Sequence, residues 1–160
     1  MSYRLTAMTA PFAAQVAGWR YPPPYDTYDL GPEDMSHLLQ PEHRYHVVWD
    51  GLDIVGYCCF GVDATVPGGD YSRDALDVGW GMRPALVGHG RGSGFVAAIV
   101  GFAAEAYAPL RMRVTIAEFN ERSQRAAARN GFTVETGRFA GPDGMRFMVL
   151  ERADEPPRGA

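Results

Sequence analysis

Hydrophobic and polar positions alternate along some segments of the chain and recur at helical spacing along others. Alternation among β-branched and aromatic residues predicts strands, and recurrence every three or four residues predicts helices. The predicted strands are residues 3–8, 45–49, 54–60, 76–82, 111–118, 133–139 and 145–151. The predicted helices are residues 9–19, 31–39, 90–107 and 120–129.

Local signals support several of these boundaries. Asp50-Gly51 lies between two strand-like runs, which is typical of a β-hairpin. Asn120 stands where the last helix should begin and can cap it. Gly79 and Gly81 fall inside the strand 76–82 and indicate either a β-bulge or a close approach of neighbouring groups to the backbone.

The order of predicted elements is β-α-α-β-β-β-α-β-α-β-β. A hairpin in the middle of the chain excludes a purely doubly wound sheet. We therefore predict one α+β domain over residues 1–151, with a central mixed, mostly antiparallel sheet of about six or seven strands and about four helices on both faces. The polar tail, residues 152–160, is expected to be disordered.

Composition and charge narrow the classes of function. All 15 basic residues are arginine, so the chain has no lysine for Schiff-base or general-base chemistry. The net charge is −4 and the arginines are dispersed, which argues against nucleic-acid binding. No apolar run approaches the roughly 18 residues of a membrane span, and no signal peptide is recognisable, so we expect no membrane association and a cytoplasmic location.

The two cysteines, Cys58 and Cys59, are adjacent. On a strand their side chains point to opposite faces, so a disulfide between them is not expected. Adjacent cysteines also match no zinc-ligand spacing, and we predict no metal site.

The most informative segment is the glycine-rich run from Val87 to Phe95, between a strand and a strong helix. Backbone N–H groups of such a turn converge, and the helix dipole adds partial positive charge, so a pyrophosphate is the expected ligand. A Walker A loop is excluded because it needs a lysine. A dinucleotide fingerprint would need a glycine at Ser93 and an acidic residue near position 107, where the chain has Tyr107.

This run, the strand Asp77–Pro84 before it and the later segments Asn120–Ser123 and Arg129–Phe132 resemble motifs of the GNAT N-acetyltransferase superfamily. Gly90 and Gly92 match the two small positions of its acetyl-CoA loop. The resemblance implies splayed fourth and fifth strands and transfer of acetyl from acetyl-CoA to a primary amine without a covalent intermediate. It is compatible with a homodimer.

The resemblance also implies roles for individual residues. The cofactor-binding residues would be Met82, Val87, Gly88, His89, Gly90, Arg91, Gly92, Ser93 and Asn120. Met82 would contact pantetheine through its backbone, and Asn120 would face the thiol end. Position 87 is valine where the family usually has glutamine or arginine. The usual tyrosine acid is replaced by Ala127, which leaves open a non-catalytic acetyl-CoA-binding sensor or subunit.

Two carboxylates near the splay, Asp77 and Glu118, are the predicted catalytic bases, because the acceptor amine must lose a proton before it attacks. His43 and His46 are further candidates. Tyr21, Tyr25 and Tyr28 fall where the superfamily builds its acceptor pocket, and they are predicted to contact a small-molecule or peptide amine. The alternative is that these rings only pack on the sheet.

Overall fold

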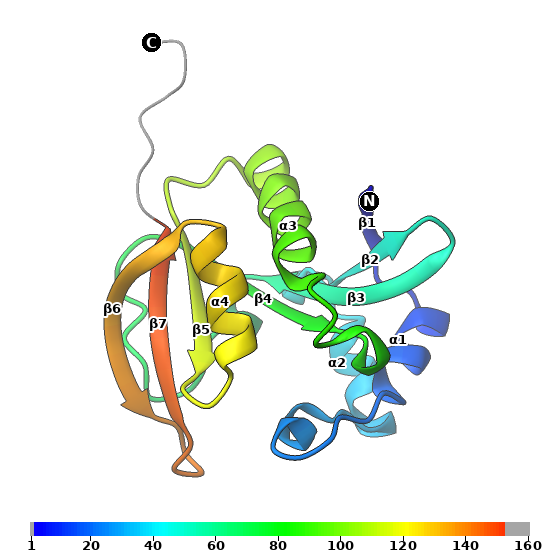
Figure 1. Cartoon of the computed structure of the whole chain (residues 1–160), viewed down its shortest axis with the longest axis horizontal. Coiled ribbons are helices and arrows are strands. Elements are labelled where there is room, and N and C mark those ends of the chain that lie inside the picture. The colour runs from blue at the N-terminus through cyan, green and yellow to red at the C-terminus, as the bar shows by residue number, and fades with distance from the viewer. Residues whose placement is uncertain (1, 153–160) are drawn as a thin grey trace.

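A seven-stranded mixed sheet forms the centre of the computed structural model, which describes residues 2–152 (Figure 1). Its strand order is β1-β2-β3-β4-β5-β7-β6. The strands are β1 (Tyr3–Ala7), β2 (His46–Asp50), β3 (Asp53–Phe60), β4 (Leu76–Met82), β5 (Met112–Ala117), β6 (Phe132–Ala140) and β7 (Arg146–Arg152). Only β4 and β5 pair in parallel; the other neighbouring strands are antiparallel. The predicted fold class is confirmed.

Four α-helices accompany the sheet: α1 (Ala10–Ala17), α2 (Met35–Leu38), α3 (Gly92–Tyr107) and α4 (Glu121–Arg129). Short 3-10 helices add η1 (Tyr25–Tyr28), η2 (Pro32–Asp34), η3 (Pro41–His43), η4 (Val62–Ala64) and η5 (Pro84–Leu86). None of the helices within residues 2–152 is long and apolar enough to cross a membrane. The predicted tail begins one residue too early, because Arg152 still belongs to β7; residues 153–160 lie outside the described part.

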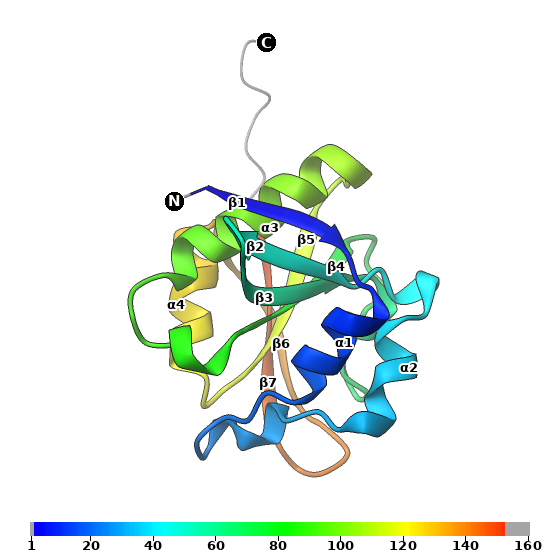
Figure 2. The ribbon, with the colours of Figure 1, turned by 90° about the vertical axis from the view of Figure 1, so that its right-hand side faces the viewer.

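The helices divide between two hydrophobic cores (Figures 1 and 2). The larger core packs α3 and α4 on one side of the sheet, around Phe95, Ile99 and Phe132. The smaller core packs α1 and α2 through Val16 and Leu38. Consecutive strand side chains point to opposite faces, so β3 serves both cores.

The glycines of β4 reflect close approach of side chains and not a bulge in the β3–β4 ladder. That ladder runs without a register shift from Phe60↔Val78 to Gly56↔Met82. A Cβ added at Gly81 would lie 2.6 Å from the ring of Tyr57, and one at Gly79 would lie 3.0 Å from a cysteine Sγ of β3. The bulge alternative is therefore wrong for this ladder, and the close-approach alternative is confirmed.

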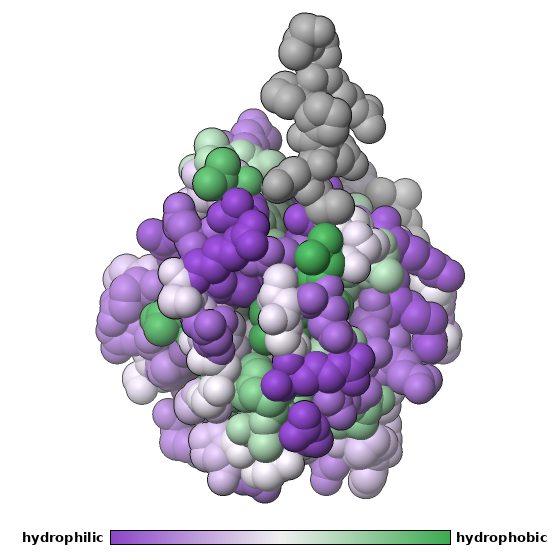
Figure 3. Space-filling model, turned by 90° about the vertical axis from the view of Figure 1, so that its left-hand side faces the viewer, coloured by the Kyte–Doolittle hydropathy of each residue, from purple (hydrophilic) through white to green (hydrophobic). Residues whose placement is uncertain are grey.

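The outer edge of the sheet is protected by charge. The edge strand β6 is mostly exposed, and the face of the molecule at this edge is largely hydrophilic (Figure 3). Arg138 bonds Glu135 on the same strand, with a 2.7 Å contact between guanidinium and carboxylate. Charged side chains on an edge strand oppose pairing with another chain.

Strands β4 and β5 separate after two residue pairs. Their ladder holds only Leu76↔Met112 and Asp77↔Arg113, after which β4 follows β3 and β5 follows β7. Figure 1 shows the two strands running in clearly different directions. The predicted splay of the fourth and fifth strands is therefore present.

A buried ion pair stands at the last shared residue pair. Arg113 Nε donates to Asp77 Oδ1 at 2.7 Å, and its Nη2 donates to Asp77 Oδ2 at 2.8 Å. Both side chains are buried, and hydrogen bonding to Asp77 raises the pKa of Arg113 above its ordinary value. Nη1 of the same guanidinium donates to the Arg73 carbonyl, so the group is fully engaged.

We expect Asp77→Asn to lower the free energy of unfolding by about 3–5 kcal/mol, because it removes the carboxylate that binds the buried Arg113 at two nitrogens and leaves only Glu151 as a nearby negative charge. Urea denaturation followed by circular dichroism would measure this loss. The matched control is Asp74→Asn on the exposed segment before β4, which should change stability by less than about 0.5 kcal/mol. Equal stability of the two variants would contradict the structural role of the ion pair.

Candidate active site

The glycine-rich loop ends in an open helix start. Gly88 and Gly90 adopt φ of +84° and +75°, a region that suits glycine, and a Cβ at Gly90 would meet no atom within 4 Å. The first hydrogen bond of α3 runs from Phe95 N–H to the Arg91 carbonyl. The amides of residues 92–94 therefore precede the helical ladder, and with the helix dipole they form a suitable cradle for a phosphate.

Two arginines have side chains at this loop, Arg91 from within it and Arg122 from a neighbouring helix. Arg91 donates to Asp50 Oδ2 at 2.6 Å and so ties the loop to the β2–β3 turn. Arg122, on the first turn of α4, lies beside Gly88, where an added Cβ would be 3.5 Å from its guanidinium carbon. The Arg122 guanidinium also lies 5.2 Å from the centre of the Tyr25 ring.

Arg122 is a site residue that the sequence analysis missed. The available signal was its position two residues after the predicted cap Asn120, because the first turn of a helix can face a neighbouring loop. Nothing in the local pattern identified that loop. The structure shows that it is the glycine-rich one.

The side chains of the remaining loop residues differ in exposure. His89 is exposed, and Val87 and Ser93 are partly buried. The carbonyl of Ser93 accepts a 3.0 Å hydrogen bond from Asn130 Nδ2, which joins the start of α3 to the end of α4. This bond holds the two helices that border the loop.

The predicted acceptor tyrosines bridge the splay. The hydroxyl of Tyr21 donates to the carbonyl of Met82, at the end of β4, over 2.6 Å. On the other side, Asn120 Nδ2 donates to the hydroxyl of Tyr28 over 3.2 Å, and the Tyr28 ring stacks on Phe119 at 5.9 Å. The segment that contains these tyrosines therefore connects the ends of the two diverging strands.

Asn120 has a second interaction. Its Oδ1 accepts a hydrogen bond from the backbone N–H of Ser123 at 3.2 Å, so it caps α4 as predicted. The side-chain amide of Asn120 is thus fixed through both its oxygen and its nitrogen.

Burial raises the pKa values of Tyr28 and Tyr21 above their ordinary value, so both phenols keep their protons at neutral pH.

The helix position that usually carries the acid cannot supply a proton here. The side chain of Ala127 is fully buried in the core between α3, α4 and the sheet. One turn earlier, Ser123 Oγ accepts a 2.8 Å hydrogen bond from Trp80 Nε1 of β4. The hydroxyl of Tyr28 is the phenol that is hydrogen-bonded to Asn120, the residue that caps the start of α4.

The two predicted bases lie in ion pairs. Asp77 is bound on both carboxylate oxygens by the buried Arg113, so its geometry argues against a role as base. Glu118, at the end of β5, has 30% of its side chain exposed, and its Oε1 lies 3.4 Å from Arg138 Nη1 and 3.5 Å from Arg146 Nε. Of the two carboxylates, Glu118 is the one that water can reach.

Other reactive side chains have no catalytic environment. Burial raises the pKa of Cys58 well above its ordinary value and that of Cys59 to about 12, so both thiols are poor nucleophiles. They are free and not joined in a disulfide. Burial lowers the pKa of His46, whose ring packs on Phe60 and Phe102.

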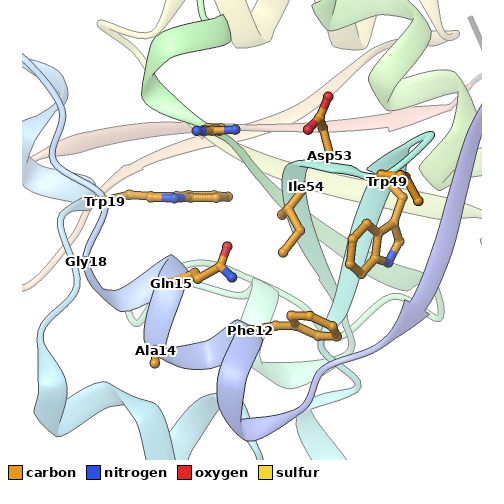
Figure 4. Close-up of a pocket in the computed structure, with 10 residues that line it drawn as sticks. Phe12, Ala14, Gln15, Gly18, Trp19, Trp49, Asp53 and Ile54 are labelled. Atoms are coloured by element: carbon orange, nitrogen blue, oxygen red, sulfur yellow. The ribbon is translucent and has the colours of Figure 1, made fainter.

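A separate hollow of about 440 Å³ lies between α1 and the β2–β3 hairpin (Figure 4). Trp19 and Gln15 face Ile54 and Asp53 across it, and Phe12 meets the ring of Trp49 at its far end. It is lined by none of the predicted cofactor residues or acceptor tyrosines. We assign no acetyl-CoA contact to this hollow.

Comparison with known proteins agrees with this geometry. The family model of the GNAT acetyltransferase domain matches residues 7–133. No curated protein matches the sequence.

Solved structures share the fold at low sequence identity. The aminoglycoside acetyltransferase AAC(6')-Ib in complex with coenzyme A is 18% identical, with a TM-score of 0.72 over 92% of this chain and 94% of that chain. A GNAT-family acetyltransferase from Bacillus anthracis is 14% identical, with a TM-score of 0.71 over 94% of each chain. A chimera of spermidine N-acetyltransferase SpeG from Vibrio cholerae and hSSAT is 14% identical, with a TM-score of 0.70 over 95% of each.

The family match covers most of the chain, and the solved structures share its overall fold along more than nine tenths of its length. The chain therefore belongs to the GNAT family and is an acetyl-CoA-dependent N-acyltransferase.

Proposed function

We propose that the enzyme transfers acetyl directly from acetyl-CoA to a primary amine of a small molecule or peptide. The observation that carries this proposal is the tyrosine-bearing segment, which bridges the splayed strands next to the open glycine-rich loop. The structural neighbours named as aminoglycoside and spermidine acetyltransferases support an amine acceptor.

The loop residues fit a pyrophosphate. Gly90 leaves open space where a side chain would stand, and the start of α3 offers amides that precede its first hydrogen bond. Arg122 adds a permanent positive charge beside Gly88. We assign the predicted loop residues, Val87 to Ser93, to phosphate binding through their backbone, with Arg122 as an additional contact.

The acceptor segment fits a cationic amine. Tyr21, Tyr25 and Tyr28 present aromatic surface, and the same segment carries Asp26, which is exposed. Asp29 is held in place by the backbone N–H of Tyr21, which donates to its Oδ1 at 2.8 Å. Two carboxylates near three aromatic rings favour binding of a protonated amine before its deprotonation.

The reaction needs a base that deprotonates the acceptor amine and an acid that protonates the leaving thiolate. An alkylamine with a pKa of about 10.4 costs about 4.6 kcal/mol to deprotonate at pH 7, whereas a thiolate with a pKa of about 8.5 costs only about 2 kcal/mol. We propose that Glu118 accepts the amine proton through a water molecule. We assign the hydroxyl of Tyr28 as the donor that protonates the leaving thiolate as the C–S bond breaks and the C–N bond forms. The nitrogen loses its second proton as the amide forms, and this proton restores the Tyr28 hydroxyl.

The activity itself is tested by following thiol release from acetyl-CoA with a panel of polyamines, aminoglycosides and peptides that have free N-termini. We expect CoA release that depends on one class of amine, with a product heavier by one acetyl group in mass spectrometry. Binding of acetyl-CoA without CoA release for any amine would favour the non-catalytic module instead.

Acetyl-CoA at about 100 times its dissociation constant should raise the midpoint of thermal unfolding by roughly 5–11 °C, with NADH and ATP as controls.

Gly90→Val should reduce the affinity for acetyl-CoA by about tenfold or more, because a β-branched residue is strained at positive φ and its side chain fills the cradle. The matched variant is Gly101→Ala on α3, where an added Cβ meets no atom within 4 Å. Unchanged affinity in Gly90→Val would refute the loop assignment.

Tyr28→Phe should lower kcat by about 100-fold while leaving the KM for acetyl-CoA nearly unchanged, because the ring still stacks on Phe119 but the proton donor is lost. Steady-state kinetics with the identified amine would measure both constants. Tyr25→Phe is the control, since its ring also contacts Phe119. Equal kcat values for the two variants would exclude Tyr28 as the acid.

A further inference from the structure

Two histidines and an aspartate meet at a corner of the molecule that acetyl transfer does not use. His37 lies on α2, His43 on η3 and Asp63 on η4. One ligand atom from each lies within 4.8 Å of the other two. Among the described residues, 2–152, these three form the one group of at least three histidine, cysteine or acidic side chains whose ligand atoms lie close enough to hold a metal ion. We refer to it as the His–His–Asp cluster.

The proton positions in the cluster follow from its hydrogen bonds. His43 Nδ1 lies 2.7 Å from the backbone carbonyl of His37. A carbonyl can only accept, so Nδ1 of His43 carries the proton, and Nε2 of the neutral ring carries the lone pair that a metal needs. The ring of His43 is therefore held in the tautomer that binds metal through Nε2.

The carboxylate is held in a similar way. Tyr45 donates its hydroxyl to Oδ2 of Asp63, which leaves Oδ1 directed toward His37. Oδ1 of Asp63 lies 2.5 Å from Nε2 of His37. Metal ligands in proteins typically have their outer atoms bonded in this manner by a carbonyl, a hydroxyl or a carboxylate.

Charge also favours a cation in the cluster. The ring centres of His37 and His43 are 4.0 Å apart, so two protonated rings would repel each other. The Asp63 side chain is only 17% exposed, and its negative charge lies against the His37 ring, where it can also attract a cation. A divalent ion would displace the proton that lies between His37 Nε2 and Asp63 Oδ1, and it would then bind the carboxylate and one nitrogen of each ring.

We propose that the His–His–Asp cluster is a zinc site. Four-coordinate zinc binds imidazole nitrogen and carboxylate oxygen at about 2.0–2.2 Å, which places its ligand atoms about 3.3–3.6 Å apart. The ligand atoms of the cluster lie within 4.8 Å of one another, and His37 Nε2 and Asp63 Oδ1, now 2.5 Å apart, would separate to admit the ion. Two nitrogen ligands favour zinc over magnesium or calcium. His37 is half-exposed, with 48% of its side chain accessible, which leaves a fourth position for water.

The role of such an ion is to join three short elements. Helices α2, η3 and η4 have only about one turn each. One residue from each of them contributes a ligand atom to the cluster. Tyr45, which orients Asp63, packs on Tyr57, and Tyr57 packs on Trp19 just before the acceptor segment. The site therefore braces the side of the domain that carries the acceptor segment, and its existence is independent of the proposed acetyl transfer.

The test is titration of chelator-treated, full-length protein with Zn²⁺ by isothermal calorimetry, without acetyl-CoA. We expect one ion per chain, and a loss of affinity of about tenfold or more in His43→Ala and in Asp63→Asn. Asp63→Asn retains an oxygen that can accept from Tyr45, and circular dichroism would confirm that each variant is folded. His89→Ala, which removes an exposed histidine elsewhere, should bind zinc as the wild type does.

A second readout uses Co²⁺, whose visible absorption reports nitrogen and oxygen ligands in a four-coordinate site. The band should form with the wild-type protein and with His89→Ala but not with His43→Ala. Absence of zinc binding to the wild type would overturn the proposal. Stoichiometric binding that persists unchanged in both His43→Ala and Asp63→Asn would place the ion elsewhere and would also overturn it.

Discussion

The buried ion pair between Asp77 and Arg113 is the constraint on which the rest of the site depends. It occupies the last residue pair that β4 and β5 share, and each of these two buried charges is stabilised by the other, with Glu151 of β7 as a further negative charge near Arg113. The Arg113 guanidinium also lies 5.0 Å from the centre of the Tyr71 ring, whose hydroxyl bonds Thr115 of β5. The point at which the strands part is therefore held from several directions.

The divergence creates two strand ends that face different neighbours. Met82 ends β4, and Asn120 follows β5 and caps α4. The segment with Tyr21 and Tyr28 reaches both ends through hydrogen bonds from different residues. These hydrogen bonds hold the segment to the sheet at two points, and they fix the position of the Tyr28 phenol proposed above as the proton donor.

The acceptor side of the domain relies on polar and aromatic contacts more than on helix packing. Helices α1 and α2 are short, and the buried part of their core consists of Ala13, Val16 and Leu38. The rings of Tyr45, Tyr57 and Trp19 pack around this small core in tilted contacts. A metal ion at the proposed His–His–Asp site would stabilise the side of the domain that contains the smaller of the two hydrophobic cores.

The sequence by itself determined the order and type of the elements and the place of the glycine-rich loop. These features depend on local causes, such as hydrophobic periodicity, the cap at Asn120 and the freedom of Gly90 to adopt positive φ. The strand boundaries deviated by at most one residue, because the ends of elements depend on pairing with neighbours.

Only the tertiary structure decided which side chains meet. Asp77 is a candidate base in sequence but an ion-pair partner in the fold, because residue 113 lies opposite it in the parallel register. Arg122 lies beside the glycine-rich loop, and His37 contacts Asp63. Both contacts join residues that are far apart in the sequence, so hydrophobic periodicity could not predict them. A repeat pattern indicates which face a side chain occupies, whereas its partner depends on strand register and on where the sheet diverges.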